Sequence, residues 1–137
     1  MKLSAIGRLM RLENCAMAGV AVVIGFVVAG GLVGGLSSEQ VRHLGLFLAI
    51  VATFLITGAG NIINDYFDRE TDKKNAPKRP IPSGLINAQN AYYLAIGLFV
   101  AGVAISFFIN PYCLLLAGFN SLALYFYGKR LKSSVFI

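Results

Sequence analysis

The sequence predicts an all-α, polytopic membrane protein with about four transmembrane helices. Of its 137 residues, 57% are hydrophobic and only 13% are charged, a composition outside the range of typical soluble domains. The apolar residues form four long runs that are separated by short charged or proline-rich segments. The length allows no more than one domain.

The four expected spans differ in length. The first three are long enough to cross a bilayer, whereas the fourth has 16 residues and would measure about 24 Å, below the hydrocarbon thickness of about 30 Å. We expect neighbours to bury the fourth, a thinned bilayer to accommodate it, or the helix to continue from Gly128 onward. Residues 2–14 have the spacing of an amphipathic helix that lies in the interface. The expected spans are 15–36, 44–63, 91–109 and 112–127.

Positive charge alternates between successive connections. Lys and Arg number three before the first span, then one, five and none in the connections, and three after the last span. Basic residues accumulate on the cytoplasmic side of membrane proteins. The pattern predicts a multi-pass protein of the cell membrane whose amino terminus, 64–90 loop and carboxyl terminus face the cytoplasm.

The net charge of +6 does not indicate a nucleic-acid partner. Its basic residues lie in short segments between apolar runs and do not form one continuous face, which nucleic-acid binding would require. We therefore expect contact with membrane lipids and none with nucleic acid.

Acidic residues are concentrated at the end of the second expected span. Four of the six lie between positions 65 and 72. If the helix continues, residues 61, 64, 65, 68 and 72 share a stripe of roughly 100°, with Asp65 and Asp72 about 10 Å apart along the axis and Glu70 on another side. Such a spacing suits a diphosphate with divalent cations, and ligands that are all oxygen atoms favour Mg²⁺, Mn²⁺ or Ca²⁺ over Zn²⁺.

An acidic helix end is more often a solvated face than a binding site. The span that precedes this cluster favours the binding site here. A charged residue at the bilayer centre costs about 2.5 to 3.5 kcal/mol, so these carboxylates must lie at the polar end of the span or face a wet cavity.

The motif resembles a known family. Asn64, Asp65, Asp68 and Asp72, followed by the segment from Lys78 to Gly84, are similar to the first aspartate-rich motif of the UbiA family of intramembrane prenyltransferases. The segments 11–14 and 72–83 most resemble the archaeal digeranylgeranylglyceryl phosphate synthases of that family. The resemblance covers about the first half of such an enzyme, because members have about nine transmembrane helices and a second aspartate motif that is absent here.

The resemblance implies a fold and a reaction. The chain would form the first half of a UbiA-type helical bundle, and the enzyme would transfer a prenyl group, geranylgeranyl in the nearest branch, from its diphosphate to a lipid acceptor such as geranylgeranylglyceryl phosphate. Magnesium would be the cofactor, held by Asp65, Asp68 and Asp72, the expected catalytic residues, together with Asn64. The expected substrate-binding residues are Asn61, Asn64, Lys78, Arg79, Arg11 and Asn14.

Other interpretations remain open from the sequence. An aromatic acceptor of the quinone pathway would use the same donor motif. A non-catalytic membrane fragment, or a subunit of a transporter, would also place polar residues at the end of a span. Since one aspartate stripe supplies only one side of a diphosphate site, we expect the chain to need a missing carboxyl-terminal half for transfer.

Overall fold

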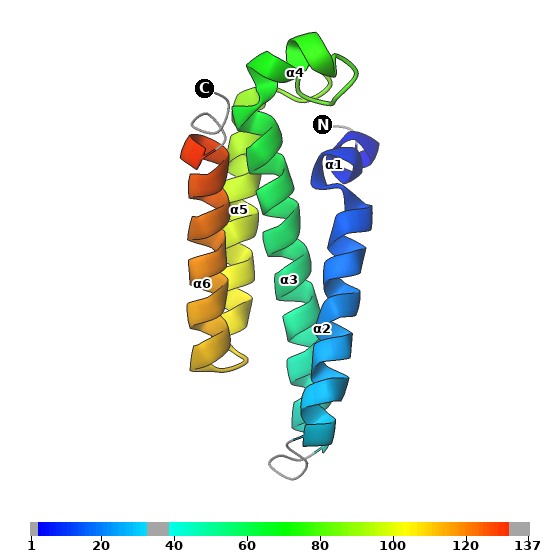
Figure 1. Cartoon of the computed structure of the whole chain (residues 1–137), viewed down its shortest axis with the longest axis vertical. Helices are drawn as coiled ribbons and strands as arrows, with labels where there is room; N and C mark the ends of the chain where they lie inside the picture. Colours follow the sequence, from blue (N-terminus) through cyan, green and yellow to red (C-terminus); the bar gives the residue numbers. More distant parts are fainter. Residues whose placement is uncertain (1–2, 33–38, 132–137) are drawn as a thin grey trace.

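The computed structural model describes residues 3–32 and 39–131, and within these ranges the chain is helical apart from short connections. Four long helices lie side by side, and a short helix at the amino terminus lies at one end of them (Figure 1). The described part of the chain contains no strand. In order, the helices are α1 (Leu3–Met10), α2 (Leu12–Leu32), α3 (Glu39–Phe67), α4 (Arg69–Asn75), α5 (Ala88–Phe107), α6 (Pro111–Phe126) and the π-helix η1 (Tyr127–Leu131).

Three of the helices are long and apolar enough to cross a membrane, which makes the chain a multi-pass membrane protein. The spans are Leu12–Ala29 in α2, His43–Phe67 in α3 and Ala88–Phe107 in α5. With 16 residues, α6 is shorter than these, but it continues directly into η1, so a single helical run extends from Pro111 to Leu131. The structure thus has the extension that the sequence suggested from Gly128 onward.

Several helix boundaries differ from the sequence expectation by a few residues. The first span begins at Leu12, three residues earlier than expected, while residues 33–36 lie outside the described part of the chain. The expected 64–90 loop contains the end of α3, all of α4 and the start of α5. The motif remains largely helical because proline does not occur before Pro77.

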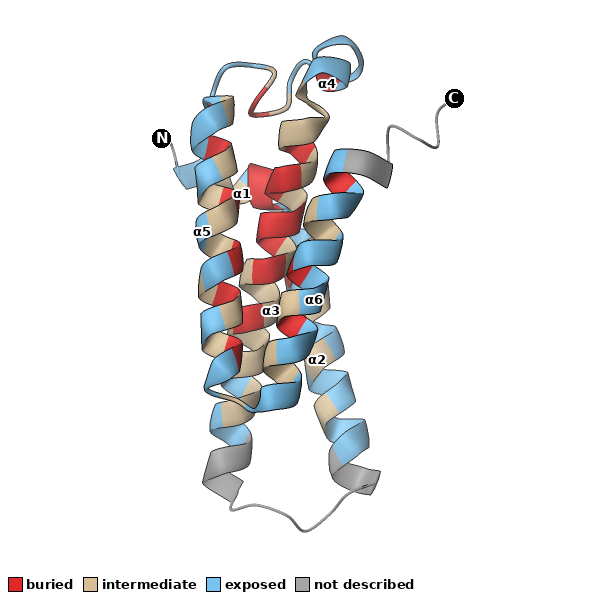
Figure 2. Cartoon of the chain, turned by 90° about the vertical axis from the view of Figure 1, so that its left-hand side faces the viewer, coloured by how far each residue is buried: buried red, intermediate tan, exposed pale blue. Residues whose placement is uncertain are grey.

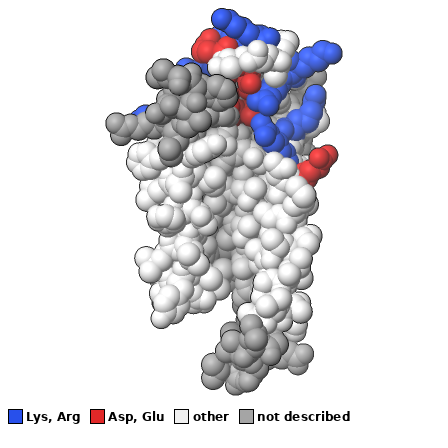
Figure 3. Space-filling view, in the orientation of Figure 1, with Lys and Arg blue, Asp and Glu red and all other residues white. Residues whose placement is uncertain are grey.

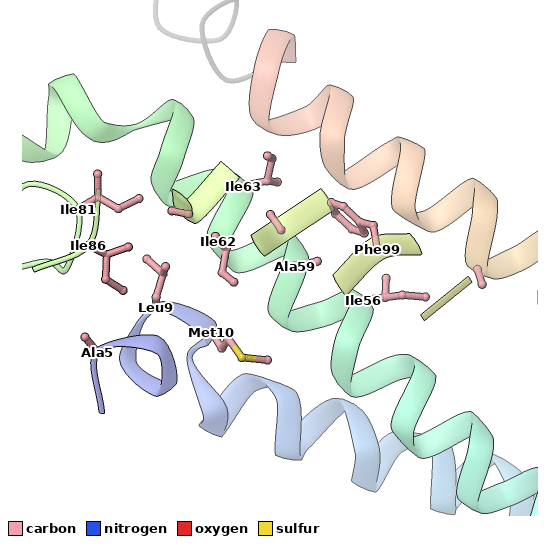
Figure 4. Close-up of a cluster of buried hydrophobic side chains, with 13 residues drawn as sticks. Ala5, Leu9, Met10, Ile56, Ala59, Ile62, Ile63, Ile81, Ile86 and Phe99 are labelled. Carbon is pink, nitrogen blue, oxygen red and sulfur yellow. The ribbon is translucent and has the colours of Figure 1, made fainter. Parts of the chain in front are cut away.

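Helix α3 forms the centre of the bundle. It packs against α1, α2, α5 and α6, and the buried positions concentrate on α3 and on the side of α5 that faces it (Figure 2). Large aliphatic side chains fill this core at the end near the motif (Figure 4). They come from α3, from α1 and from the connection after α4, and include Ile62, Ile63, Leu9, Ile81 and Ile86.

Small residues let α5 approach α3 closely. A Cβ atom at Gly102 would lie 2.6 Å from Ile56 Cγ1 and 3.2 Å from the backbone oxygen of Ala52. Both distances are shorter than ordinary van der Waals contact, so only glycine fits without a shift of α3. Close approach of this kind stabilises membrane helices through van der Waals packing. The hydrophobic effect does not drive their association, because lipid tails are as apolar as the side chains.

We predict that Gly102→Ala lowers the free energy of unfolding by about 1 to 3 kcal/mol, since overpacking displaces Ile56 or the α3 backbone. Gly97→Ala on the same helix is the control, because a Cβ atom there meets nothing within 4 Å. Unfolding in mixed detergent micelles, followed by circular dichroism, measures both. Equal effects of the two substitutions would contradict the close α3–α5 contact.

Candidate functional site

The charged residues visible in Figure 3 gather at one end of the molecule, while the body of the bundle is uncharged on that face. This end carries α1, α4 and the end of α6 (Figure 1). The sequence-predicted site residues therefore lie at one end of the spans and outside the apolar middle. A transporter-like charge near the middle of a span is absent from the described residues of α2, α3, α5 and α6.

The chain turns sharply at Arg11 between α1 and α2, and we call this turn the elbow. Two α3 side chains bind to it. Asn61 Nδ2 donates a hydrogen bond to the backbone oxygen of Met10 at 2.8 Å, and Arg11 Nη2 donates to Asp65 Oδ1 at 2.8 Å. Because Asn61 and Asp65 are four residues apart, they share one face of α3. Asn61 and Asp65, two members of the predicted stripe, thus anchor the amino-terminal segment to α3.

Arg11 forms the elbow itself. Its φ angle is 53°, in the left-handed region, which few residues other than glycine adopt. The helix breaks there, and the backbone N–H of Asn14 donates to the Arg11 carbonyl at 2.9 Å as α2 begins. The surrounding contacts from Asn61 and Asp65 keep the backbone in this unfavourable conformation.

The aspartate motif also breaks into two helices, which corrects the expected continuous stripe. Helix α3 ends at Phe67, Asp68 lies at the break, and Asp72 belongs to α4.

The side chain of Arg79 connects Asp65 and Asp72. Arg79 Nη1 donates to Asp72 Oδ2 at 2.6 Å and lies 3.5 Å from Asp65 Oδ1. One guanidinium nitrogen of Arg79 therefore reaches both carboxylates.

The proline-rich connection returns Arg79 to the motif. Pro77 and Pro80 prevent a longer helix after α4, and Gly84 adopts a φ of 76° that suits a residue without Cβ. Ile81 and Ile86 are buried in the core next to α1 and α3, so they fix the connection on the bundle. Arg79 is consequently held by packing as well as by its ion pairs.

The two buried carboxylates of this network are each paired with an arginine. Asp65 and Asp72 are only 3% and 7% exposed, and a buried carboxylate needs a cation or hydrogen bonds to remain ionised. Arg11 and Arg79 supply both. The hydrogen bond to Asp72 raises the pKa of Arg79 further above its usual value, so the guanidinium stays charged at every physiological pH.

The remaining predicted residues are less closely connected. Lys78 is exposed, Asp68 is half-buried at the helix break, and Asn14 is half-buried at the start of α2. The Oδ1 atom of Asn64 is buried and has no hydrogen-bond partner among the described residues, and it faces Gly128 of η1, where a Cβ atom would lie 2.9 Å away. Asn64 is thus oriented toward η1, whereas Asp65 is oriented toward α1.

Glu70 is separate from the network, as its position outside the stripe predicts. Its side chain is exposed and pairs with Lys73 at 3.0 Å and with Arg69 at 3.6 Å. Neither partner contacts Asp65 or Asp72 in the described residues. Glu70 therefore offers a matched acidic control for the motif.

The donor set suits magnesium, although the described residues contain no group of three or more His, Cys, Asp or Glu side chains around one point. Magnesium is ordinarily bound through one or two carboxylates, and substrate phosphates and water complete its octahedron. Asp65 and Asp72 provide two such carboxylates at one place. Asn64 is turned away from them.

Sequence reasoning missed how the cations are used. Arg11 and Arg79 were expected to meet a substrate, whereas here each pairs with an aspartate of the motif. The apolar residues Ile81 and Ile86 in this proline-rich connection could have indicated that it packs on the bundle, since both are buried in the structure. No signal in the sequence predicted the elbow at Arg11.

The chain is similar to known proteins over most of its length. A family model described as "UbiA prenyltransferase family" matches residues 18–137. The chain is 46% identical over 131 residues to a protein of Methanococcoides burtonii named digeranylgeranylglyceryl phosphate synthase, with 93% of this chain and 46% of the relative covered. It is 47% identical over 124 residues to a protein of the same name from Methanothrix thermoacetophila, with 90% and 44% covered.

A solved structure is also similar. It is described as giving structural and mechanistic insights into the biosynthesis of digeranylgeranylglyceryl phosphate synthase in membranes. Its TM-score to this chain is 0.85 and the identity is 35%, with 95% of this chain and 44% of that chain covered. The chain thus spans about half the length of the relatives it matches. The family match, the shared fold and the motif at the end of a span show that this chain belongs to the UbiA prenyltransferase family.

Proposed function

We propose that the chain forms the donor-binding half of a prenyltransferase that moves a geranylgeranyl group from its diphosphate to geranylgeranylglyceryl phosphate, a step of ether-lipid biosynthesis. The observation that carries the proposal is the buried network of Asp65, Arg79 and Asp72 at the end of a span. The names of the relatives support the choice of donor and acceptor. Because the chain spans about half of their length, transfer requires the other half of the site.

Asp65, Asp68 and Asp72 are the proposed metal side of the donor site. UbiA prenyltransferases generally use Mg²⁺, which neutralises a diphosphate and stabilises it as a leaving group. Asp65 and Asp72 would hold the ion, and Asp68 lies between them at the helix break. Asn64 and Asn61 are the amide side chains nearest to Asp65 in sequence.

Arg79 and Lys78 are the proposed phosphate side. Arg79 contacts both carboxylates through Nη1 alone, so its other N–H groups suit the oxygens of a diphosphate. Lys78 is exposed beside it and adds a second positive charge. These cations hold the diphosphate while the bond between its oxygen and the allylic carbon breaks.

The prenyl chain needs an apolar chamber that excludes water. A cavity of about 360 Å³ lies between the spans and is lined by α2, α3, α5 and α6, including Val22, Ile56, Ser106 and Leu116. Ser106 donates its hydroxyl to the backbone oxygen of Gly102, so it presents little polarity to the cavity. The prenyl tail would occupy this chamber. The acceptor hydroxyl oxygen would form the new bond to the allylic carbon beside the departing diphosphate, and would release its proton there.

We predict that Asp65→Asn, Asp68→Asn and Asp72→Asn each weaken magnesium-dependent binding of geranylgeranyl diphosphate by about tenfold or more, because each removes a charged ligand. Glu70→Gln should change binding less than about twofold, since among the described residues Glu70 pairs with Lys73 and Arg69 and with neither Asp65 nor Asp72. Equilibrium binding of radiolabelled donor with and without magnesium measures this. A loss in Glu70→Gln as large as in the others would refute the assignment.

The site is proposed to face the cytoplasm, because five basic residues lie between α3 and α5 and none between α5 and α6. In a variant without native cysteines, a cysteine at Ser83 should react with an impermeant reagent only when the cytoplasmic face is open. A cysteine at Phe108, exposed at the opposite end of α5, should react from outside. Reaction of both from one side would disprove this orientation.

A further inference from the structure

The elbow between α1 and α2 encloses a groove that the donor site does not use. Its volume is about 690 Å³. Ser4 and Arg8, four residues apart, line it from one side of α1, and Arg11 lines it from the elbow. The first turn of α2 lines the other side, and the opposite face of α1, with Ala5 and Leu9, is buried in the core.

Two guanidinium groups are available to a ligand in this groove. Arg8 is exposed, and its side chain makes no hydrogen bond or ion pair with any part of the chain that the structure describes. Arg11 uses Nη2 for Asp65 and remains 41% exposed, so its other N–H groups can reach the groove. Glu13 contributes one acidic side chain to the lining.

The groove is also amphipathic. Leu3 and Leu12, which line it, are 84% and 49% exposed, so apolar surface borders the two arginines. Helix α1 lies at the charged end of the bundle (Figures 1 and 3), next to the start of the first span at Leu12. A ligand that matches the groove has a phosphate for the arginines and a hydrocarbon chain for the leucines.

We propose that this elbow groove binds the phosphate monoester of the lipid acceptor, an inference that rests on the proposed function. A phosphate monoester carries between about −1.5 and −2 charges near pH 7, which suits two guanidinium groups that can each bind in a fork. The phosphodiester of a bulk phospholipid and the carboxylate of an aromatic acceptor each carry only −1. Arg11 links the groove to Asp65, so the acceptor headgroup is held beside the donor motif.

The position of the groove depends on the left-handed backbone at Arg11. That conformation turns α1 back so that Arg8 and Arg11 lie opposite the start of α2. Asn61 and Asp65 hold the elbow through Met10 and Arg11. The geometry of acceptor binding is therefore set by two residues of the same helix that carries the donor motif.

The test is binding of hexadecylglycerol phosphate to the 137-residue chain in phosphatidylcholine nanodiscs, without donor. Arg8→Gln should weaken binding about tenfold, and Glu13→Gln should strengthen it, because the first removes a charged donor and the second removes a repelling carboxylate. Both side chains are exposed, so neither variant should unfold, and circular dichroism confirms this. Lys74→Gln, an exposed cation on α4 outside the groove, is the matched control and should leave binding unchanged.

Several outcomes would overturn the proposal. Equal losses in Lys74→Gln and Arg8→Gln would indicate general attraction between the protein and anionic lipid. Equal affinity for phosphatidylglycerol would indicate a contact with bulk phospholipid, and equal affinity for 4-hydroxybenzoate would indicate an aromatic acceptor. Magnesium-dependent donor binding, measured on the same samples, fails independently if the proposed donor site is wrong, because the acceptor probe needs no donor.

Discussion

The ion pairs of two buried carboxylates determine how this end of the molecule is built. Asp65 lies at the end of a membrane span and Asp72 on the following helix, and both are almost completely buried. An unpaired charge in such a place would cost several kcal/mol. Arg11 and Arg79 remove that cost from two directions, one from the amino-terminal elbow and one from the connection after α4.

The rest of the local structure follows from this requirement. The chain must reverse at Arg11 to place its guanidinium on Asp65, and it must reverse again after α4 to place Arg79 between Asp65 and Asp72. Buried Leu9, Ile81 and Ile86 pack both reversals against α3. The same pairs leave two arginines beside two carboxylates, a combination that suits both the metal ion and the phosphates of a prenyl diphosphate.

Helices and charge distribution could be predicted from the sequence because they depend on local patterns. Long apolar runs produced α2, α3 and α5 near their expected positions, and the stripe placed Asn61 and Asp65 correctly on one face. The break at Asp68, the return of Arg79 and the orientation of Asn64 depend on packing between distant segments. Periodicity carries no information on such contacts, so the expected straight stripe was wrong beyond Phe67.

The most direct test of this account is a double-mutant cycle between Arg79 and Asp72, with Arg79→Met, Asp72→Asn and the double variant unfolded in mixed micelles. The account predicts a coupling free energy of about 1 kcal/mol or more, a modest value because Arg79 is 38% exposed and solvent screens part of the attraction. The losses of unfolding free energy in the two single variants should therefore add up to more than the loss in the double variant. Strictly additive effects would show that the two side chains do not interact and would contradict the network on which the site depends.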